Sequence, residues 1–460
     1  MNNTKKEKTS PILAVGYAFG EVGAQMSWYM VNNFLTLFYT DVVGLAASAI
    51  SFIMLVARVW DAINDPMMGT ICDRTNTRWG RFRPWLYFAP PFLAVFNVLT
   101  FTVFPLHGTM KVVVCLLCYI GTGMAYTASN IPYYALQNVI AIDSKVRIVL
   151  ATARGIGNSV VGIALSALAA PALLKLSHEG AVAADAQGYF RFALILSIAM
   201  LVPFFLCATI CKEKYTDELH GADDEKLGFI DAVKEILKND QLLIVILATL
   251  LGAICVTGRM SMLSYYIIYV VGDFAHIAKF FLVMTIAQLI GTAFIPLGTN
   301  LLSKEGYLIA LQLIMNAGFL IMYLMPNAGI PFLLAISFMC GLCNSAGSVT
   351  YGMVADAIEY GDWKLGRRQE GVAGSMLSFS AKLATAISGS VGVLLLGAVG
   401  YVPNAVQTEM TKSGINAIVN LVPFIIGLLS LIPLFMYKLS PKKVEEIRTD
   451  LEAGKHAWDK

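Results

Sequence analysis

Long apolar segments, separated by short polar ones, run through almost the whole chain. A helix needs roughly 20 apolar residues to cross about 30 Å of hydrocarbon, and twelve segments are long enough to do so. They lie near 11–39, 46–72, 85–104, 109–140, 148–174, 189–211, 241–271, 275–300, 306–325, 328–359, 372–400 and 414–438. The pattern predicts an all-α membrane protein with twelve transmembrane helices.

One long polar interruption divides these segments six and six. The predicted parts are an N-terminal six-helix bundle at 11–211, a cytoplasmic linker at 212–240, a C-terminal six-helix bundle at 241–438 and a cytoplasmic tail at 439–460. Within the linker, apolar residues recur at helical spacing among charges, at Leu227, Ile230, Val233 and Leu237. This spacing predicts a short amphipathic helix on the inner membrane surface.

Composition and charge agree with a membrane protein. Hydrophobic residues make up 57% of the chain and charged residues 14%, whereas soluble domains carry roughly 25% charged residues. Most lysines and arginines fall on one side of the membrane if the N-terminus is inside, so both termini are expected in the cytoplasm. The net charge of +3 reflects this asymmetry and gives no reason to expect nucleic acid. We expect a multi-pass protein of a bacterial cytoplasmic membrane, with the lipid bilayer around it and no obligate protein partner.

The second segment carries polar groups that an apolar helix would not need: Arg58, Asp61, Asn64 and Asp65. Their spacing places them on or near one helix face. A carboxylate in hydrocarbon is costly, so it usually faces a cavity, pairs with a cation or carries an ion. Arg58 can offset one acid, and the other acid with the Asn64 oxygen makes a site suited to a hard cation. The alternative is an Arg58–Asp61 salt bridge beside a passive Asp65.

Motifs for metal binding or catalysis give little signal in the sequence. Two C-x-x-C pairs, at 115/118 and 340/343, sit within apolar segments without a nearby histidine, so small apolar filler is a better interpretation than a metal site. Zinc-hydrolase, phosphate-loop and nucleophile-elbow motifs do not occur in a plausible context. We therefore expect no enzyme activity, no cofactor and no metal beyond a transported cation.

Basic residues cluster after the second segment, where Asp73 and Arg74 are followed by further arginines up to Arg81 and Arg83. Anchoring by the positive-inside rule would explain the arginines alone. With Gly69 four residues before Asp73, the stretch also resembles the loop signature of the major facilitator superfamily. In that family the acid and the basic residues lock neighbouring helices in one access state.

Four motifs together carry a closer resemblance. They are ARVWDAINDPMMG at 57–69, DRTNTRWGRFRPW at 73–85, YTASNIPYYAL at 126–136 and VADAIEYGDWKLGRRQEG at 354–371. The chain resembles the glycoside, pentoside and hexuronide cation symporters, a branch of the major facilitator superfamily with two six-helix bundles. The resemblance implies that Asp61, Asn64 and Asp65, with Thr127 on the fourth helix, occupy the positions of the coupling-cation site.

The resemblance also points to residues for the sugar. Melibiose-type members hold it with two carboxylates, and Gln25 and Asn130 stand at the matching places here. Neutral amides bond hydroxyls less strongly than carboxylates do. Glu21, one turn before Gln25, is a candidate for sugar contact or proton coupling, or for pairing with Arg154.

Aromatic and basic residues complete the candidate substrate site. Tyr134 on the fourth helix is a candidate for stacking on a sugar ring. Arg154, and Lys382 on the eleventh helix, either hold a substrate carboxylate or neutralise the acids of the first and second helices.

The expected function is a secondary active transporter that imports a glycoside, pentoside or hexuronide with Na⁺, or with H⁺, by alternating access. Na⁺ is favoured because Asn64 and Thr127 supply neutral oxygens that a proton would not need. The alternatives are a cation-coupled transporter of lysolipids or other amphiphiles, and a membrane sugar sensor.

Overall fold

A computed structural model describes residues 10–141, 144–214, 238–366 and 370–459. These residues are helical except for connecting segments and one isolated β-bridge between Thr77 and Gly80. The chain divides into two compact units, Met1–Asp224 and Glu225–Lys460. The amphipathic helix predicted in the linker lies outside the described residues.

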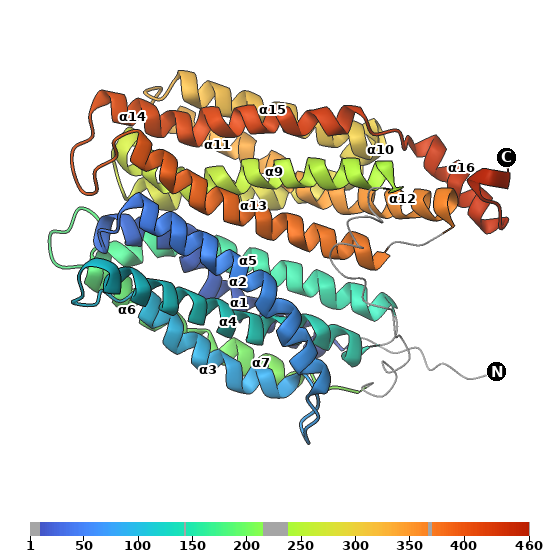
Figure 1. The fold of residues 1–460 in the computed structure, drawn as a ribbon, viewed down its shortest axis with the longest axis horizontal. Helices are drawn as coiled ribbons and strands as arrows, with labels where there is room; N and C mark the ends of the chain where they lie inside the picture. Colours follow the sequence, from blue (N-terminus) through green and yellow to red (C-terminus); the bar gives the residue numbers. More distant parts are fainter. Residues whose placement is uncertain (1–9, 142–143, 215–237, 367–369, 460) are drawn as a thin grey trace. The chain divides into compact units, whose positions relative to one another are not determined.

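The N-terminal unit is a bundle of long helices (Figure 1). Its elements are α1 (Pro11–Leu37), the π-helical turn η1 (Phe38–Val42), α2 (Ala47–Arg74), α3 (Arg83–Thr100), α4 (Gly108–Ile140), α5 (Ser144–Leu176), α6 (Ala186–Ala199) and α7 (Leu201–Ile210). In this unit α1 packs against α5 and α7, and α4 packs against α2 and α3. Helices α2 and α4, which carry the candidate cation residues, are therefore neighbours, as are α1 and α5.

The C-terminal unit repeats the helical architecture (Figure 1). Its elements are α9 (Asp240–Tyr265), η3 (Tyr266–Val271), α10 (His276–Leu324), α11 (Ile330–Cys343), η4 (Asn344–Ala346), α12 (Gly347–Leu365), α13 (Glu370–Ala398), α14 (Glu409–Asn416), η5 (Ala417–Leu421), α15 (Val422–Phe435), α16 (Pro441–Glu452) and η6 (Ala457–Asp459). Here α9 packs against α12, α13 and α15, and α10 packs against α11.

Nine helices of the described chain are long and apolar enough to cross a membrane. Helices α1 and α3, at the first and third predicted segments, are not among them, and α10 covers two predicted segments as one helix. The backbone of α10 breaks at Ser303, where φ is 66° and ψ is 166°. The Ser303 hydroxyl accepts a hydrogen bond from the Gly306 N–H at 3.2 Å, as an N-cap residue does. Two helical segments therefore meet at Ser303.

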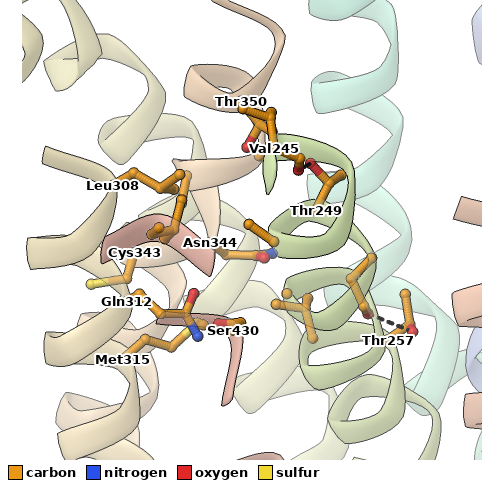
Figure 2. A pocket seen from close by; sticks show the side chains of 17 residues that line it. Val245, Thr249, Thr257, Leu308, Gln312, Met315, Cys343, Asn344, Thr350 and Ser430 are labelled. Carbon is orange, nitrogen blue, oxygen red and sulfur yellow. Dashed lines mark hydrogen bonds between the residues drawn. The ribbon is translucent and has the colours of Figure 1, made fainter. Parts of the chain in front are cut away.

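Helices α9, α10, α12 and α15, with η4, enclose a cavity of about 270 Å³ in the C-terminal unit (Figure 2). Its lining is mainly apolar, from residues such as Val245, Leu308 and Met315. Polar side chains interrupt this lining, and Gln312, Asn344 and Ser430 stand around the same space (Figure 2). A cavity of this size has room for ordered water beside these polar side chains.

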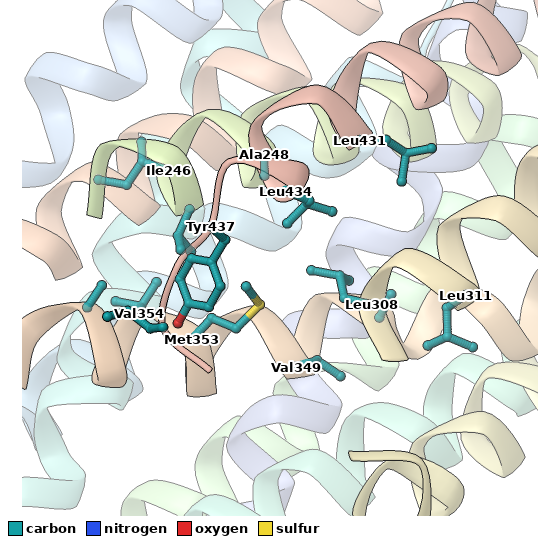
Figure 3. Close-up of a cluster of buried hydrophobic side chains, with 14 of the residues drawn as sticks. Ile246, Ala248, Leu308, Leu311, Val349, Met353, Val354, Leu431, Leu434 and Tyr437 are labelled. Atoms are coloured by element: carbon teal, nitrogen blue, oxygen red, sulfur yellow. The ribbon is translucent and has the colours of Figure 1, made fainter. Parts of the chain in front are cut away.

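A buried hydrophobic cluster of the C-terminal unit continues into the tail. Leu308 and Leu311 of α10 pack with Val349 and Met353 of α12 (Figure 3). Tail residues after α15 join the same cluster, among them Tyr437, Leu439, Val444 and Ile447. The residues 439–460, expected only as a tail, thus contribute a helix with a buried apolar side.

Ion pairs fasten that tail helix to the bundle. Arg448 on α16 donates to Glu359 on α12 at 2.7 Å, and also approaches Asp356 at 3.5 Å. Asp356 is buried and accepts from Lys304 at 2.6 Å. A buried carboxylate is stable when charged partners surround it in this way, so Asp356 connects α10, α12 and α16.

In the N-terminal unit a single carboxylate organises the start of α3. Glu213 accepts hydrogen bonds from the backbone N–H groups of Arg81, Phe82 and Arg83 at 2.8, 2.8 and 2.9 Å. The first N–H groups of a helix lack intrahelical acceptors, and negative charge is favourable there. Gly80, with φ of 108°, turns the chain into this position, and a side chain on it would collide with Glu213.

We predict that Glu213→Ala destabilises the N-terminal unit by about 2 kcal/mol, because three backbone donors lose a charged acceptor. Thermal unfolding in detergent measures the loss. Glu213→Gln should lose less, since the amide oxygen still accepts, and Glu179→Ala is the control because Glu179 is exposed. A melting temperature of Glu213→Ala equal to that of the Glu179 variant would contradict the capping role.

Candidate functional site

The two acids of α2 have different partners. The Asp61 carboxylate accepts from the Arg58 guanidinium at 3.1 Å, within the same helix. Arg58 also donates to the Tyr119 hydroxyl of α4 at 3.0 Å and lies 5.6 Å from the centre of the Trp28 ring of α1. Arg58 therefore offsets the charge of Asp61 and links α2 to α1 and α4.

Close packing of α2 and α4 depends on a glycine. A Cβ atom at Gly123 would lie 3.0 Å from Oδ1 of Asp61, tighter than an ordinary van der Waals contact. Small residues allow helices in a membrane to approach each other closely. Gly123 thus leaves the room that the Asp61 carboxylate occupies.

Asp65 is joined to α4 by a hydrogen bond. Its Oδ1 accepts from the Thr127 hydroxyl at 2.9 Å. Asn64 is buried beside it, and its amide nitrogen has no hydrogen-bond partner in the described structure. Pro66 follows directly inside the helix and has no N–H to donate to the carbonyl of Ala62. On α2 the Asn64 amide and the Ala62 carbonyl stand within one helical turn of the Asp65 carboxylate, and α4 adds the Thr127 hydroxyl. Oxygens of these types are the donors that hard cations prefer.

Aromatic side chains lie beside the candidate sugar residue on α4. The rings of Trp28 on α1 and Tyr126 on α4 stack with centroids 4.3 Å apart. The Tyr126 hydroxyl accepts from the Asn130 amide at 3.2 Å. Asn130 is buried, and its carbonyl oxygen has no donor among the described residues. That acceptor suits a hydroxyl group of a ligand.

The acid of α1 is held by its neighbour on the same helix. Gln25 donates to Oε1 of Glu21 at 3.0 Å, while Oε2 of the buried Glu21 has no partner in the described chain. No ion pair between Glu21 and Arg154 occurs in the part of the chain that the structure covers. The Arg154 guanidinium instead lies 4.7 Å from the centre of the Tyr134 ring. Arg154 is thus engaged in a cation–π contact.

Comparison of the sequence with known proteins identifies the family of this chain. The model of the MFS/sugar transport protein family matches residues 16–441. The glucuronide carrier protein homolog of Escherichia coli (strain K12) is 32% identical, over 96% of this chain and 95% of that protein. The isoprimeverose transporter of Lactiplantibacillus pentosus is 31% identical, over 96% and 91% of the two chains.

The chain belongs to the glycoside-pentoside-hexuronide:cation symporters. It is a multi-pass membrane transporter of the major facilitator superfamily, and not an enzyme. A solved D-xylose-proton symporter is similar in fold, with a TM-score of 0.65 at 13% identity over 94% of this chain and 98% of that one. The symporter family couples sugar movement to a cation.

The other predicted residues of this symporter are dispersed. Lys382 lies partly buried on α13 of the C-terminal unit. Asp73 and Arg74 belong to the last turn of α2 and not to the following loop, so the predicted boundary was too early. Arg81 lies in the loop, with its guanidinium 5.9 Å from the centre of the Phe82 ring.

Several structural residues of the symporter were missed from sequence. Glu213 and Tyr119 make polar contacts across the bundle, yet neither belongs to a recognisable motif. All eight cysteines are buried, and none of them forms a disulfide. The described residues contain no group of three His, Cys, Asp or Glu side chains that could hold a metal ion.

We predict that Gly123→Ala lowers the apparent affinity for the coupling cation, since its methyl group would displace the Asp61 carboxylate. A displacement costing about 1.4 kcal/mol would give a roughly tenfold effect. Cation-stimulated sugar uptake in membrane vesicles measures it. Gly155→Ala on α5 is the matched control, because a Cβ there meets nothing within 4 Å and gains the same helix propensity. Equal cation dependence in both variants would refute the packing argument.

Proposed function

We propose that this symporter imports a glycoside, pentoside or hexuronide together with Na⁺ by alternating access. The observation that carries the proposal is the hydrogen bond from Thr127 to Asp65. Thr127 and Asn130 are three residues apart on α4 and so lie about one turn from each other. A cation that engages Asp65 and Thr127 thereby orders the same helix turn that presents Asn130 to the sugar.

Charge supports a monovalent cation. Asp61 and Asp65 contribute two negative charges and Arg58 one positive charge, so the group carries one net negative charge when both acids are ionised. One Na⁺ would neutralise it. The Thr127 hydroxyl donates to Asp65 and keeps oxygen lone pairs for a cation, which favours Na⁺ over H⁺.

Two buried acceptors support a hydroxyl-rich substrate. Oε2 of Glu21 and Oδ1 of Asn130 lack donors in the described structure, and an unsatisfied buried acceptor costs about 1–3 kcal/mol. Sugar hydroxyl groups are suitable donors. The stacked rings of Trp28 and Tyr126 offer an apolar face for the sugar ring.

The relatives support both neutral and anionic sugars. One relative carries the name of a glucuronide carrier homolog and another that of an isoprimeverose transporter. Arg154 and Lys382 are the basic residues that would meet a uronide carboxylate. We favour a neutralising role for both, because their charges balance acids of the transport pathway.

The remaining assignments follow the family pattern. We propose six-helix bundles at 11–211 and 241–438, a linker at 212–240, and a tail at 439–460, with both termini in the cytoplasm of a bacterial cell. Asp73, Arg74 and Arg81 are proposed to stabilise one access state; the backbone of Arg81 is held by Glu213.

Uptake by vesicles under imposed Na⁺ or H⁺ gradients tests the proposal. The panel contains labelled α- and β-glycosides, xylosides, glucuronides and one lysolipid. We expect accumulation of at least one sugar under the Na⁺ gradient. Accumulation under the H⁺ gradient alone would overturn Na⁺ coupling, and uptake of the lysolipid alone would overturn the substrate class.

We predict that Asp65→Asn abolishes gradient-driven accumulation but leaves the folded protein in the membrane. The amide oxygen still accepts the Thr127 hydrogen bond, while the charge that attracts the cation is lost. Accumulation ratios and equilibrium sugar exchange, measured on the same vesicles, separate coupling from passive binding. Thr127→Val retains the charge and should lose only part of the coupling, which typically amounts to about 1–3 kcal/mol. Full Na⁺-driven accumulation by Asp65→Asn would exclude this cation site.

We predict that Lys382→Ala and Arg154→Ala lower the affinities for neutral glycosides and for uronides to a similar extent. This is expected when both residues neutralise acids. A residue that held the substrate carboxylate would affect only the charged ligand. Competition between a glycoside and its uronide analogue, in wild type and both variants, measures the difference. Selective loss of the uronide would instead identify a hexuronide transporter.

A further inference from the structure

A buried charge in the core of the C-terminal unit has no role in the proposed transport site. Arg259 is on α9 and is 1% exposed. Arginine stays protonated in proteins, so a full positive charge is buried there. Such a charge is costly unless it has a partner.

The side chains around Arg259 compensate it only weakly. Its guanidinium donates to the Met322 sulfur at 3.1 Å and lies 4.0 Å from the Met284 sulfur. It also lies over the Phe319 ring, 4.7 Å from the ring centre. Thioether sulfur is a weak acceptor, and the ring face provides only a partial electrostatic partner.

Among the described residues, carboxylates do not balance the charge of Arg259 either. Within the described residues no salt bridge joins Arg259 to an acid, and its Nε has no hydrogen-bond partner. Other acids of this unit pair with other bases: Asp356 with Lys304 and Arg448, and Asp240 with Lys364. The charge of Arg259 therefore requires a partner that the described protein does not supply.

A small cavity of about 10 Å³ adjoins Arg259. Val256, Met315 and Asn344 line both this cavity and the larger one of Figure 2. The Asn344 amide donates one hydrogen bond to Gln288 and has a second N–H available. Gln312, which lines the larger cavity, has an amide nitrogen without a partner in the described chain. Asn344 thus borders both spaces, and Arg259 borders the smaller one.

We propose that Arg259 and Asn344 bind a small monovalent anion, a halide such as chloride, in the core of the C-terminal unit. The small cavity has room for about one water-sized particle, and the flexible methionines beside it can adjust to a slightly larger ion. A sugar carboxylate with its ring does not fit this volume.

Thermal unfolding of the purified full-length protein tests the proposal. Sodium salts of chloride, bromide and gluconate are compared at equal ionic strength, without sugar. We expect chloride and bromide to raise the melting temperature of wild type over gluconate, by an amount that grows with the logarithm of halide concentration above Kd. The sodium concentration is constant, so the proposed cation site does not contribute to the difference.

Two variants separate a specific site from a general salt effect. Arg259→Met should lose the halide response, whereas Arg259→Lys should keep part of it because the charge remains. If Arg259→Met does not fold, anomalous diffraction from bromide in the wild-type protein locates the ion directly, with a peak beside Arg259 expected. Three outcomes would overturn the proposal. They are a wild-type melting temperature that does not change with halide, an equal halide-dependent change in Arg259→Met, and a bromide peak found only away from Arg259.

Discussion

Every charged side chain in the membrane region of this protein has to be compensated, and the α2 charges show how this constraint shapes the N-terminal unit. Arg58 pairs with Asp61 and reaches Tyr119 on α4. Water cannot stabilise these groups in hydrocarbon, so their partners must come from neighbouring helices. The electrostatic requirement thus fixes the approach of α2 to α4, and Gly123 provides the space for it.

The helices of the proposed sugar site are also held together before any ligand binds. The Tyr133 hydroxyl of α4 donates to the backbone carbonyl of Tyr17 on α1 at 2.9 Å, and the two rings stack 4.7 Å apart. Tyr17 precedes Glu21 by one turn, and Tyr133 follows Asn130 by three residues. Because this pairing positions the acceptor side chains in advance, less binding free energy is lost in ordering them.

The family, the all-α transporter fold and the absence of enzyme activity could be predicted from sequence, since apolar segment length and the α2 motif are local signals. The contacts of Asp65 and Thr127 could be anticipated only through family resemblance, because the two residues are 62 positions apart. Glu213 and Arg448 escaped prediction for a different reason. Each acts through backbone groups or acids that are distant in sequence, and single charges in polar segments have no distinctive pattern.

The break at Ser303 has a mechanical consequence for the C-terminal unit. The two helical segments of α10 are joined by one residue with a positive φ angle, whose hydroxyl also caps the second segment. A connection of one residue cannot lengthen, so the two segment ends that meet at Ser303 must stay together during any conformational change. One residue inserted within either segment would rotate the side chains between it and the joint by about 100° relative to the rest of that segment, so the helical turns next to Ser303 should tolerate no change in length.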